Sequence, residues 1–69
     1  MKLSARNVLK GKVKSIVNGA LNSEVVIELA GGTPLVSVIT KSSVEGLNLK
    51  VGMTAYAVVK ASDVLVGTD

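Results

Sequence analysis

Two short polar stretches near either end of this sequence contain the side chains best suited to chemistry. The first is Ser4-Ala5-Arg6-Asn7, which holds the only arginine, and the second is Lys60-Ala61-Ser62. Guanidinium, ammonium and hydroxyl groups all donate hydrogen bonds, and arginine presents its donors as a rigid fork. This set suits a ligand that offers only acceptors, such as a small, fully deprotonated oxyanion. The composition of the two stretches therefore predicts oxyanion binding.

The spacing of the donors supports this prediction. Each stretch places its donors two residues apart, and residues two apart in an extended strand share a face, so Ser4 would lie with Arg6 and Lys60 with Ser62. The alanine between each pair is small and lets main-chain N–H groups approach a ligand. A lone arginine close to a terminus is more often a solvated side chain. The combination of the two stretches, rather than either alone, favours a site.

A third stretch, Asn18-Gly19-Ala20-Leu21-Asn22, has two interpretations. Its asparagines and glycine are typical of a hairpin turn. Successive backbone N–H groups in such a turn can also form a nest that binds anions. We take the turn as the main interpretation and a second, weaker oxyanion site as the alternative.

The composition argues against an enzyme. Histidine and cysteine are both absent, so a base, a nucleophile or a metal ligand would have to come from five carboxylates, the lysines and some hydroxyls. Glu24 and Glu28 alternate with apolar residues and fall on the wet face of a predicted strand. We therefore expect no catalytic residues, no cofactor and no direct protein ligands to a metal.

Nucleic-acid binding is the alternative that the charge suggests. The formal net charge is +3, and Lys10, Lys12 and Lys14 form a basic row along one strand face. Single-strand binders also need aromatic platforms worth about 1–3 kcal/mol per base, and Tyr56 is the only aromatic residue. The row is better explained as a face that keeps a strand soluble. Nucleic-acid binding is thus the weaker interpretation.

Hydrophobic periodicity predicts two strands in the first half of the chain. Residues 8–17 alternate apolar positions with lysines, and residues 23–30 alternate them with glutamates. The turn at Asn18-Gly19 joins them as a hairpin, in which lysines could face glutamates. The positions expected to point inward are Leu9, Val13, Val17, Val25, Ile27 and Leu29.

The second half predicts a third strand, a short helix and a final extended segment. Residues 35–40 are rich in β-branched residues. Ser42 and Glu45 have the spacing of a capping box, which would start a helix that Asn48 or Gly52 could close. Residues 53–66 alternate again and are long for one strand, so we expect a bend near residues 61–63.

This order of elements indicates an all-β fold, a small five-stranded OB-type Greek-key barrel with one short helix between strands three and four. An SH3-like barrel is the competitor if that helix is only a single 3₁₀ turn. The sequence is interpreted as one domain over residues 1–69, in which residues 65–69 form a C-terminal tail.

Size and composition predict that the chain works as a homo-oligomer. A domain of 69 residues buries only about 60% of the surface of its unfolded chain, and no disulfide can supplement its core. Yet 48% of its residues are hydrophobic, which is more apolar surface than so small a monomer easily hides. No stretch resembles a signal peptide or a membrane span of roughly 18 apolar residues. We expect a cytoplasmic protein.

At this point the sequence resembles a known family, the molbindins or Mop proteins, whose fold recurs as the TOBE module of molybdate-dependent regulators and transport ATPases. The resemblance covers residues 3–66 and is specific in combination. It rests on SARNVLKGKV at the start, EVVIELAGG in the middle, ITKSSVEGLNLKVG around the helix, and AYAVVKASDV at the end.

The resemblance implies a cytoplasmic protein that binds molybdate or tungstate and stores or buffers it. It also implies a hexamer, built as a trimer of dimers, with oxyanions held between subunits. The residues that match the family's main interfacial site are Ser4, Ala5, Arg6, Lys60, Ala61 and Ser62. The loop of residues 18–22 matches the region near a second kind of site, toward the three-fold axis. A pterin cofactor is the alternative ligand that the older family name suggests, and the lack of aromatic residues to sandwich a pterin argues against it.

Overall fold

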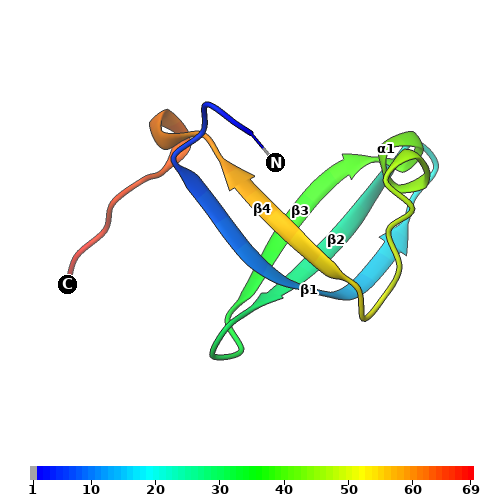
Figure 1. Cartoon of the computed structure of the whole chain (residues 1–69), viewed down its shortest axis with the longest axis horizontal. Helices are drawn as coiled ribbons and strands as arrows, with labels where there is room; N and C mark the ends of the chain where they lie inside the picture. Colours follow the sequence, from blue (N-terminus) through cyan, green and yellow to red (C-terminus); the bar gives the residue numbers. More distant parts are fainter. Residues whose placement is uncertain (1) are drawn as a thin grey trace.

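The computed structural model of the chain describes residues 2–69 as a curled antiparallel sheet with one short helix (Figure 1). The elements, in chain order, are β1 (Asn7–Asn18), β2 (Asn22–Leu29), β3 (Pro34–Thr40), α1 (Lys41–Gly46), β4 (Thr54–Val59) and the 3₁₀ helix η1 (Ala61–Asp63). No helix among the described residues is long and apolar enough to cross a membrane.

The strands follow the Greek-key order. The sheet runs β3-β2-β1-β4, so the fourth strand returns to lie beside the first after three strands joined by hairpins. All three strand pairs are antiparallel. The helix between β3 and β4 is an α-helix of six residues rather than a single 3₁₀ turn. The prediction of an all-β, OB-type fold with its helix in this place is therefore confirmed.

The prediction of five strands is wrong, because the described residues form four. The segment after β4 bends into η1, as expected near residues 61–63, but it then forms no further strand. Residues 64–66 find no partner strand within their own chain, and the side chains of Val64, Leu65 and Val66 are 50%, 92% and 90% exposed. Figure 1 shows this segment leading away from the sheet.

A β-bulge in β1 shifts which residues point inward. Val13 pairs with Ile27, but Ser15 pairs with Val26, so Lys14 is an extra residue on the β1 side. Because side chains alternate with a period of two, one extra residue exchanges the two faces beyond it. Ile16 therefore packs against the core, and Val17, which was expected inside, is 62% exposed.

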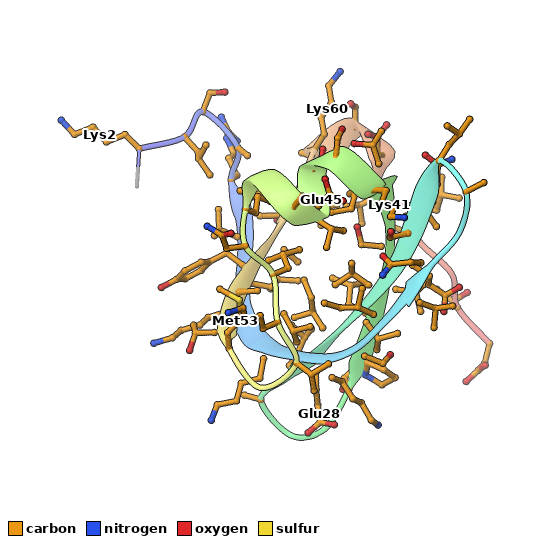
Figure 2. The ribbon with its side chains drawn as sticks, turned by 90° about the vertical axis from the view of Figure 1, so that its right-hand side faces the viewer. Lys2, Glu28, Lys41, Glu45, Met53 and Lys60 are labelled. Carbon is orange, nitrogen blue, oxygen red and sulfur yellow. The ribbon has the colours of Figure 1, made fainter. Side chains whose placement is uncertain are left out.

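The core is small and lies inside the curl of the sheet. Val13, Val25, Ile27, Val44 and Ala57 are its buried apolar side chains. Half-buried side chains surround them, including Leu29 from β2 and Ile39 from β3. Figure 2 shows α1 lying across one end of this core, so the helix acts as a lid. Five buried apolar side chains are few for 69 residues, so the core of one chain is small.

Gly11 lies where β1 passes closest to β2. A Cβ atom added at this position would lie 2.5 Å from the carbonyl oxygen of Glu28 and 2.7 Å from Cγ2 of Ile27. Because the first of these atoms is backbone, Gly11→Ala should lower the free energy of unfolding by about 1–3 kcal/mol. Urea denaturation measures this change.

Gly46→Ala is the matched control, because Gly46 is helical and a Cβ there meets nothing within 4 Å. This control should be neutral or stabilising by about 0.5–1 kcal/mol. Equal stabilities for the Gly11 variant and the original chain would contradict the close strand approach.

Helix α1 starts two residues earlier than the sequence pattern predicted. Its N-cap is Thr40, whose Oγ1 accepts a hydrogen bond from the backbone N–H of Ser43 at 3.1 Å. Ser42 thus lies inside the helix, and its predicted capping box with Glu45 is wrong. The reason is that Thr40 ends β3 in an extended conformation, which is the conformation an N-cap requires.

The helix closes at Asn48, which is one of the two positions expected to close it. Asn48 has φ of +53°, its N–H donates to the carbonyl of Glu45, and the N–H of Leu49 donates to the carbonyl of Val44. These two bonds define a Schellman motif, which is completed by an apolar contact between the same ends. Val44 is buried and Leu49 packs against the core, so the cap ties the helix to the sheet.

The cap at Thr40 gives a stability prediction. Thr40→Ala leaves the N–H of Ser43 without its acceptor and should cost about 1 kcal/mol of folding free energy. Ser42→Ala is the control, because Ser42 contacts Thr40 only through an exposed hydroxyl pair at 3.2 Å, and it should cost less than about 0.5 kcal/mol. A larger loss of stability for the Ser42 variant than for the Thr40 variant in thermal unfolding would instead support Ser42 as the N-cap.

Candidate functional site

The strand register brings the two polar stretches together. In the antiparallel pair of β1 and β4, Asn7 lies opposite Val59 and Val8 opposite Val58. Arg6 directly precedes the first paired residue of β1 and Lys60 directly follows the last paired residue of β4, so both lie at the same end of this strand pair. The start of β1 and the turn after β4 therefore adjoin at one end of the sheet, and Figure 1 shows the chain before β1 beside η1.

The local backbone differs from the extended form that the spacing suggested. Residues 4–6 precede β1, with bends at Ser4 and Arg6. Residues 61–63 form a 3₁₀ helix, closed by a 2.9 Å hydrogen bond from the N–H of Asp63 to the carbonyl of Lys60. Lys60 and Ser62 therefore do not share a strand face, and that part of the spacing argument is wrong. Ser62 instead lies within this turn. The N–H groups of Ala61 and Ser62 come before the first hydrogen bond of the 3₁₀ helix, so they have no acceptor within it.

The cations at this end of the sheet make no ion pair within 4.0 Å in the described chain. Arg6 and Lys60, which flank the last pair of this ladder, are both cations. Among the described residues, the one ion pair within 4.0 Å joins Lys14 to Glu28, at 3.4 Å. Figure 2 places Glu28 at the opposite end of the molecule from Lys60. An anion at the start of β1 would therefore lie near two cations, Arg6 and Lys60, that form no ion pair with a carboxylate in the described chain.

The exposure of the six candidate residues shows how open this arrangement is. Five of them are exposed and Ala5 is half-buried. A dianion here would touch the chain on one side and water on the other. Because hydrogen bonds to an ion gain strength where water is excluded, tight binding requires a second surface. One chain alone therefore leaves one side of such an anion open to water.

The structure adds Asp63, a residue that the sequence reasoning did not include. It is exposed and ends the 3₁₀ turn that carries Ser62. Its carboxylate makes no ion pair within 4.0 Å among residues 2–69. Its position directly after Lys60-Ala61-Ser62 is visible in the sequence, and an acidic residue is favoured in the first turn of a helix. Its role here is to close the turn through its backbone N–H.

The second predicted stretch, residues 18–22, forms the turn between β1 and β2. The N–H of Gly19 donates to the carbonyl of Asn22 at 2.7 Å, and the side chain of Asn18 accepts a hydrogen bond from the buried hydroxyl of Ser23. These contacts are those of a hairpin turn, the main interpretation above. The loop lies far from the paired stretches, at the other end of β1.

An open hollow of about 620 Å³ adjoins this loop. The start of α1 forms its other wall, and the residues around it are Ala20, Leu21, Asn22, Thr40, Lys41, Ser42 and Glu45. One lysine and several small polar groups line it, and so does a carboxylate, which would repel an anion. The charge of the hollow is therefore less favourable than that beside Arg6.

Metal ligation finds no support in the described part of the chain. No group of three or more histidine, cysteine, aspartate or glutamate residues could hold a metal ion there. The donors that the fold brings together are cationic and hydroxyl groups, which contact anions rather than metal cations. The arrangement can bind an oxyanion through hydrogen bonds to its oxygen atoms.

Comparisons with known proteins agree with this class of fold and site. The sequence of the TOBE domain family matches residues 3–66 of this chain. A probable molybdenum-pterin-binding protein from Haemophilus influenzae is 52% identical over the full length of both chains. The solved structure of MopII from Clostridium pasteurianum has a TM-score of 0.93 and 46% identity, and the match covers 97% of this chain and 100% of that one.

A third match contains the ligand. The cytoplasmic molybdate-binding protein ModG, solved with molybdate bound, has a TM-score of 0.96 and 51% identity. The match covers all of this chain and 49% of the ModG chain. These matches define a TOBE-domain protein of a binding rather than a catalytic family. The chain belongs to the molybdenum-pterin-binding (Mop) proteins of that family, as the sequence resemblance predicted.

Proposed function

We propose that this chain binds molybdate at the end of β1, between Ser4-Ala5-Arg6 and Lys60-Ala61-Ser62. The observation that carries the proposal is that Arg6 and Lys60 adjoin the last pair of the β1–β4 ladder, and that in the described chain neither makes an ion pair within 4.0 Å. The relatives support the ligand class, since one is a molybdate-binding protein solved with molybdate. The charges explain why a dianion would bind there.

Each residue has a distinct role in the proposed site. The guanidinium of Arg6 donates paired hydrogen bonds to two oxygens of the anion, and the ammonium of Lys60 supplies a second charge. The hydroxyls of Ser4 and Ser62 donate to the remaining oxygens. Ala5 and Ala61 carry no bulk that would keep main-chain N–H groups away. The side chains bind the oxyanion intact, so the proposed function includes no catalytic step and no separate cofactor.

A neighbouring subunit completes the site in this proposal. The six residues lie on an open surface, and a dianion needs donors on all sides. We therefore place the site between subunits of a homo-oligomer, a hexamer built as a trimer of dimers. The loop of residues 18–22 would form a second, weaker oxyanion site in the same assembly. The biological role that follows is storage or buffering of molybdate or tungstate in the cytoplasm, by one domain that spans residues 1–69.

A pterin form of molybdenum is the second candidate ligand, because several relatives are named molybdenum-pterin-binding proteins. The chain has one aromatic residue, Tyr56 in β4. Tyr56 pairs with Lys10 in the register and lies four residues along β4 from Lys60, outside the proposed site. The proposed site thus contains no aromatic side chain that could stack on a pterin ring, so the bare oxyanion is the better candidate.

Titration at two ionic strengths separates oxyanion binding from nucleic-acid binding. We expect saturable calorimetric binding of molybdate, with a weaker response to sulfate. A single-stranded oligonucleotide should bind weakly, and about three phosphate contacts would give a salt slope near −2. Strong, salt-dependent oligonucleotide binding together with no heat from molybdate would replace the proposal with a nucleic-acid module.

A further inference from the structure

Asn18-Gly19, at the start of the turn between β1 and β2, is the one Asn-Gly pair in the sequence. The side-chain amide carbon of an asparagine can be attacked by the backbone nitrogen of the next residue, and the two then close a five-membered succinimide ring. Glycine has no Cβ atom to obstruct this attack. The other asparagines are followed by Val8, Ser23 and Leu49, whose side chains hinder it. Asn18 is therefore the asparagine of this chain best suited to ring closure.

Ring closure at this pair needs only water and hydroxide as reactants. The nitrogen of Gly19 gives its proton to hydroxide and forms a bond to Cγ of Asn18. The bond from Cγ to Nδ2 breaks, and Nδ2 takes up a proton from water and leaves as ammonia. Water then opens the ring at either carbonyl, which gives aspartate or isoaspartate. The oxidation state of the protein does not change, so no oxidant or reductant is required.

In the folded turn, hydrogen bonds hold both of the reacting groups. The N–H of Gly19 donates to the carbonyl of Asn22 at 2.7 Å, so the proton that the attacking nitrogen must lose is engaged. The hydroxyl of Ser23 donates to Oδ1 of Asn18 at 2.7 Å. Ser23 is only 1% exposed, so its surroundings hold this donor in place. Ring closure requires that both bonds break, because the nitrogen must lose its proton and the amide must turn toward it.

The turn can open without unfolding of the whole sheet. Asn18 and Ser23 form the last pair in the register of β1 with β2, and residues 19–22 between them are exposed. On the far side of the turn the N–H of Lys41, at the start of α1, donates to the carbonyl of Leu21 at 2.8 Å (Figure 1). Segments at the end of a hairpin open at a lower free energy than the core strands. The rate of ring closure therefore depends on how often this end of the hairpin opens.

We propose that Asn18 is a site of spontaneous deamidation, and that the hydroxyl of Ser23 and the carbonyl of Asn22 protect it in the folded hairpin. In the unfolded chain neither hydrogen bond exists, and the Asn18-Gly19 pair reacts as it would in a free peptide. Loss of the Ser23 hydroxyl alone removes one of the two bonds that must break before ring closure. The turn thus controls the chemistry of its own first residue.

Deamidation would change both the charge and the length of the loop. It replaces a neutral amide with a carboxylate, which lowers the formal net charge by one, from +3 to +2. Isoaspartate also adds one methylene to the main chain of a turn whose far side is bonded to α1. The new carboxylate would repel an anion bound at residues 18–22. This last consequence rests on the proposed second oxyanion site, whereas the modification itself needs no ligand and is tested without one.

Deamidation rates of the full chain test the proposal, measured by peptide mass spectrometry at mildly alkaline pH without added oxyanion. In native buffer Asn18 should react at least about tenfold more slowly than in guanidinium chloride, because the two hydrogen bonds and the local opening that breaks them both oppose reaction. In the unfolded chain Asn18 should react before the other asparagines. Equal rates in the two solvents, or faster reaction at Asn7, Asn22 or Asn48, would overturn the proposal.

Ser23→Ala tests the protecting hydroxyl. In native buffer this variant should deamidate at Asn18 about fivefold faster than the original chain, equivalent to about 1 kcal/mol, the net contribution of one hydrogen bond. Ser15→Ala is the matched control, because Ser15 is a half-buried serine of the same hairpin that pairs with Val26, away from the turn. The control should react at the original rate.

Ser23→Cys is the second variant, because cysteine is close to serine in size and its thiol is a weaker donor. It too should deamidate faster at Asn18 than the original chain does. A folded variant of either kind that reacts no faster than the original chain contradicts the protecting role of the hydroxyl. If neither variant folds, the comparison of the original chain in the two solvents still decides whether the folded turn protects Asn18.

Discussion

Arg6→Ala should remove most molybdate binding from this protein while leaving its fold intact. The guanidinium supplies the paired, charge-assisted hydrogen bonds of the proposed site, and each such bond contributes about 1.5–3 kcal/mol. The loss of two bonds corresponds to at least a hundredfold weaker binding, or about 2.8 kcal/mol. Arg6 is exposed and precedes β1, so its removal takes nothing from the core. Titration calorimetry with molybdate measures the loss, and circular dichroism confirms the fold.

Two further variants show whether the effect belongs to the geometry of this side chain. Arg6→Lys keeps the charge but loses the fork of donors, so it should restore only part of the affinity. Lys14→Ala removes a cation from the exposed ion pair with Glu28, away from the site, and should leave binding unchanged. Full molybdate affinity in the Arg6→Ala variant would contradict the proposed main site.

Molybdate should strongly stabilise the folded protein. A ligand that binds only the folded assembly adds about 2.7 kcal/mol when its free concentration is a hundredfold above the dissociation constant. For a domain of this size that gain corresponds to a rise in melting temperature on the order of 10–20 °C. Differential scanning calorimetry with and without molybdate measures it. Tungstate should act similarly, because it is also a tetrahedral dianion.

The Arg6→Ala variant is the matched control for this stabilisation. Its melting temperature in the absence of ligand should equal that of the original chain, and molybdate should shift it by a small fraction of the original amount. Sulfate at the same ionic strength reports the non-specific effect of a dianion. A melting temperature that saturating molybdate and tungstate leave unchanged would contradict oxyanion binding to the folded protein.

Periodicity and turn residues predicted most elements of the fold. The alternation around Val25 and Ile27 placed both residues in the core, and glycine-rich turns marked the strand ends. Val17 was placed on the wrong face because the bulge at Lys14 inserts one residue, and nothing in the local pattern announces it. The helix start was misplaced because Ser42 and Thr40 both suit an N-cap, and only the end of β3 decides between them.

The number of strands shows a limit of a different kind. Residues 64–66 have the composition of a strand, and the sequence correctly indicates that propensity. Pairing, however, requires an edge, and within one chain these residues reach none. Local sequence reports which conformation a segment favours. It does not report whether a free strand edge lies within reach of that segment.

The residues proposed for the site stand out in the sequence, but their arrangement in space does not. The donor types of Arg6 and Lys60 were visible in the sequence, whereas their placement at the same end of the sheet follows from the register of β1 with β4. The strand spacing of Lys60 and Ser62 was misleading, because the backbone turns into a 3₁₀ helix at Ala61. The register thus supports the grouping for a reason that the spacing did not supply.

Native mass spectrometry of the full chain after incubation with molybdate tests the central claim most directly. It reports the number of subunits and the number of bound anions in one spectrum. The account predicts an oligomer, with six subunits, that retains molybdate, and an Arg6→Ala oligomer of the same size that has lost the anions of the main site. A monomer with bound molybdate, or an oligomer that retains the same number of anions without Arg6, would contradict it.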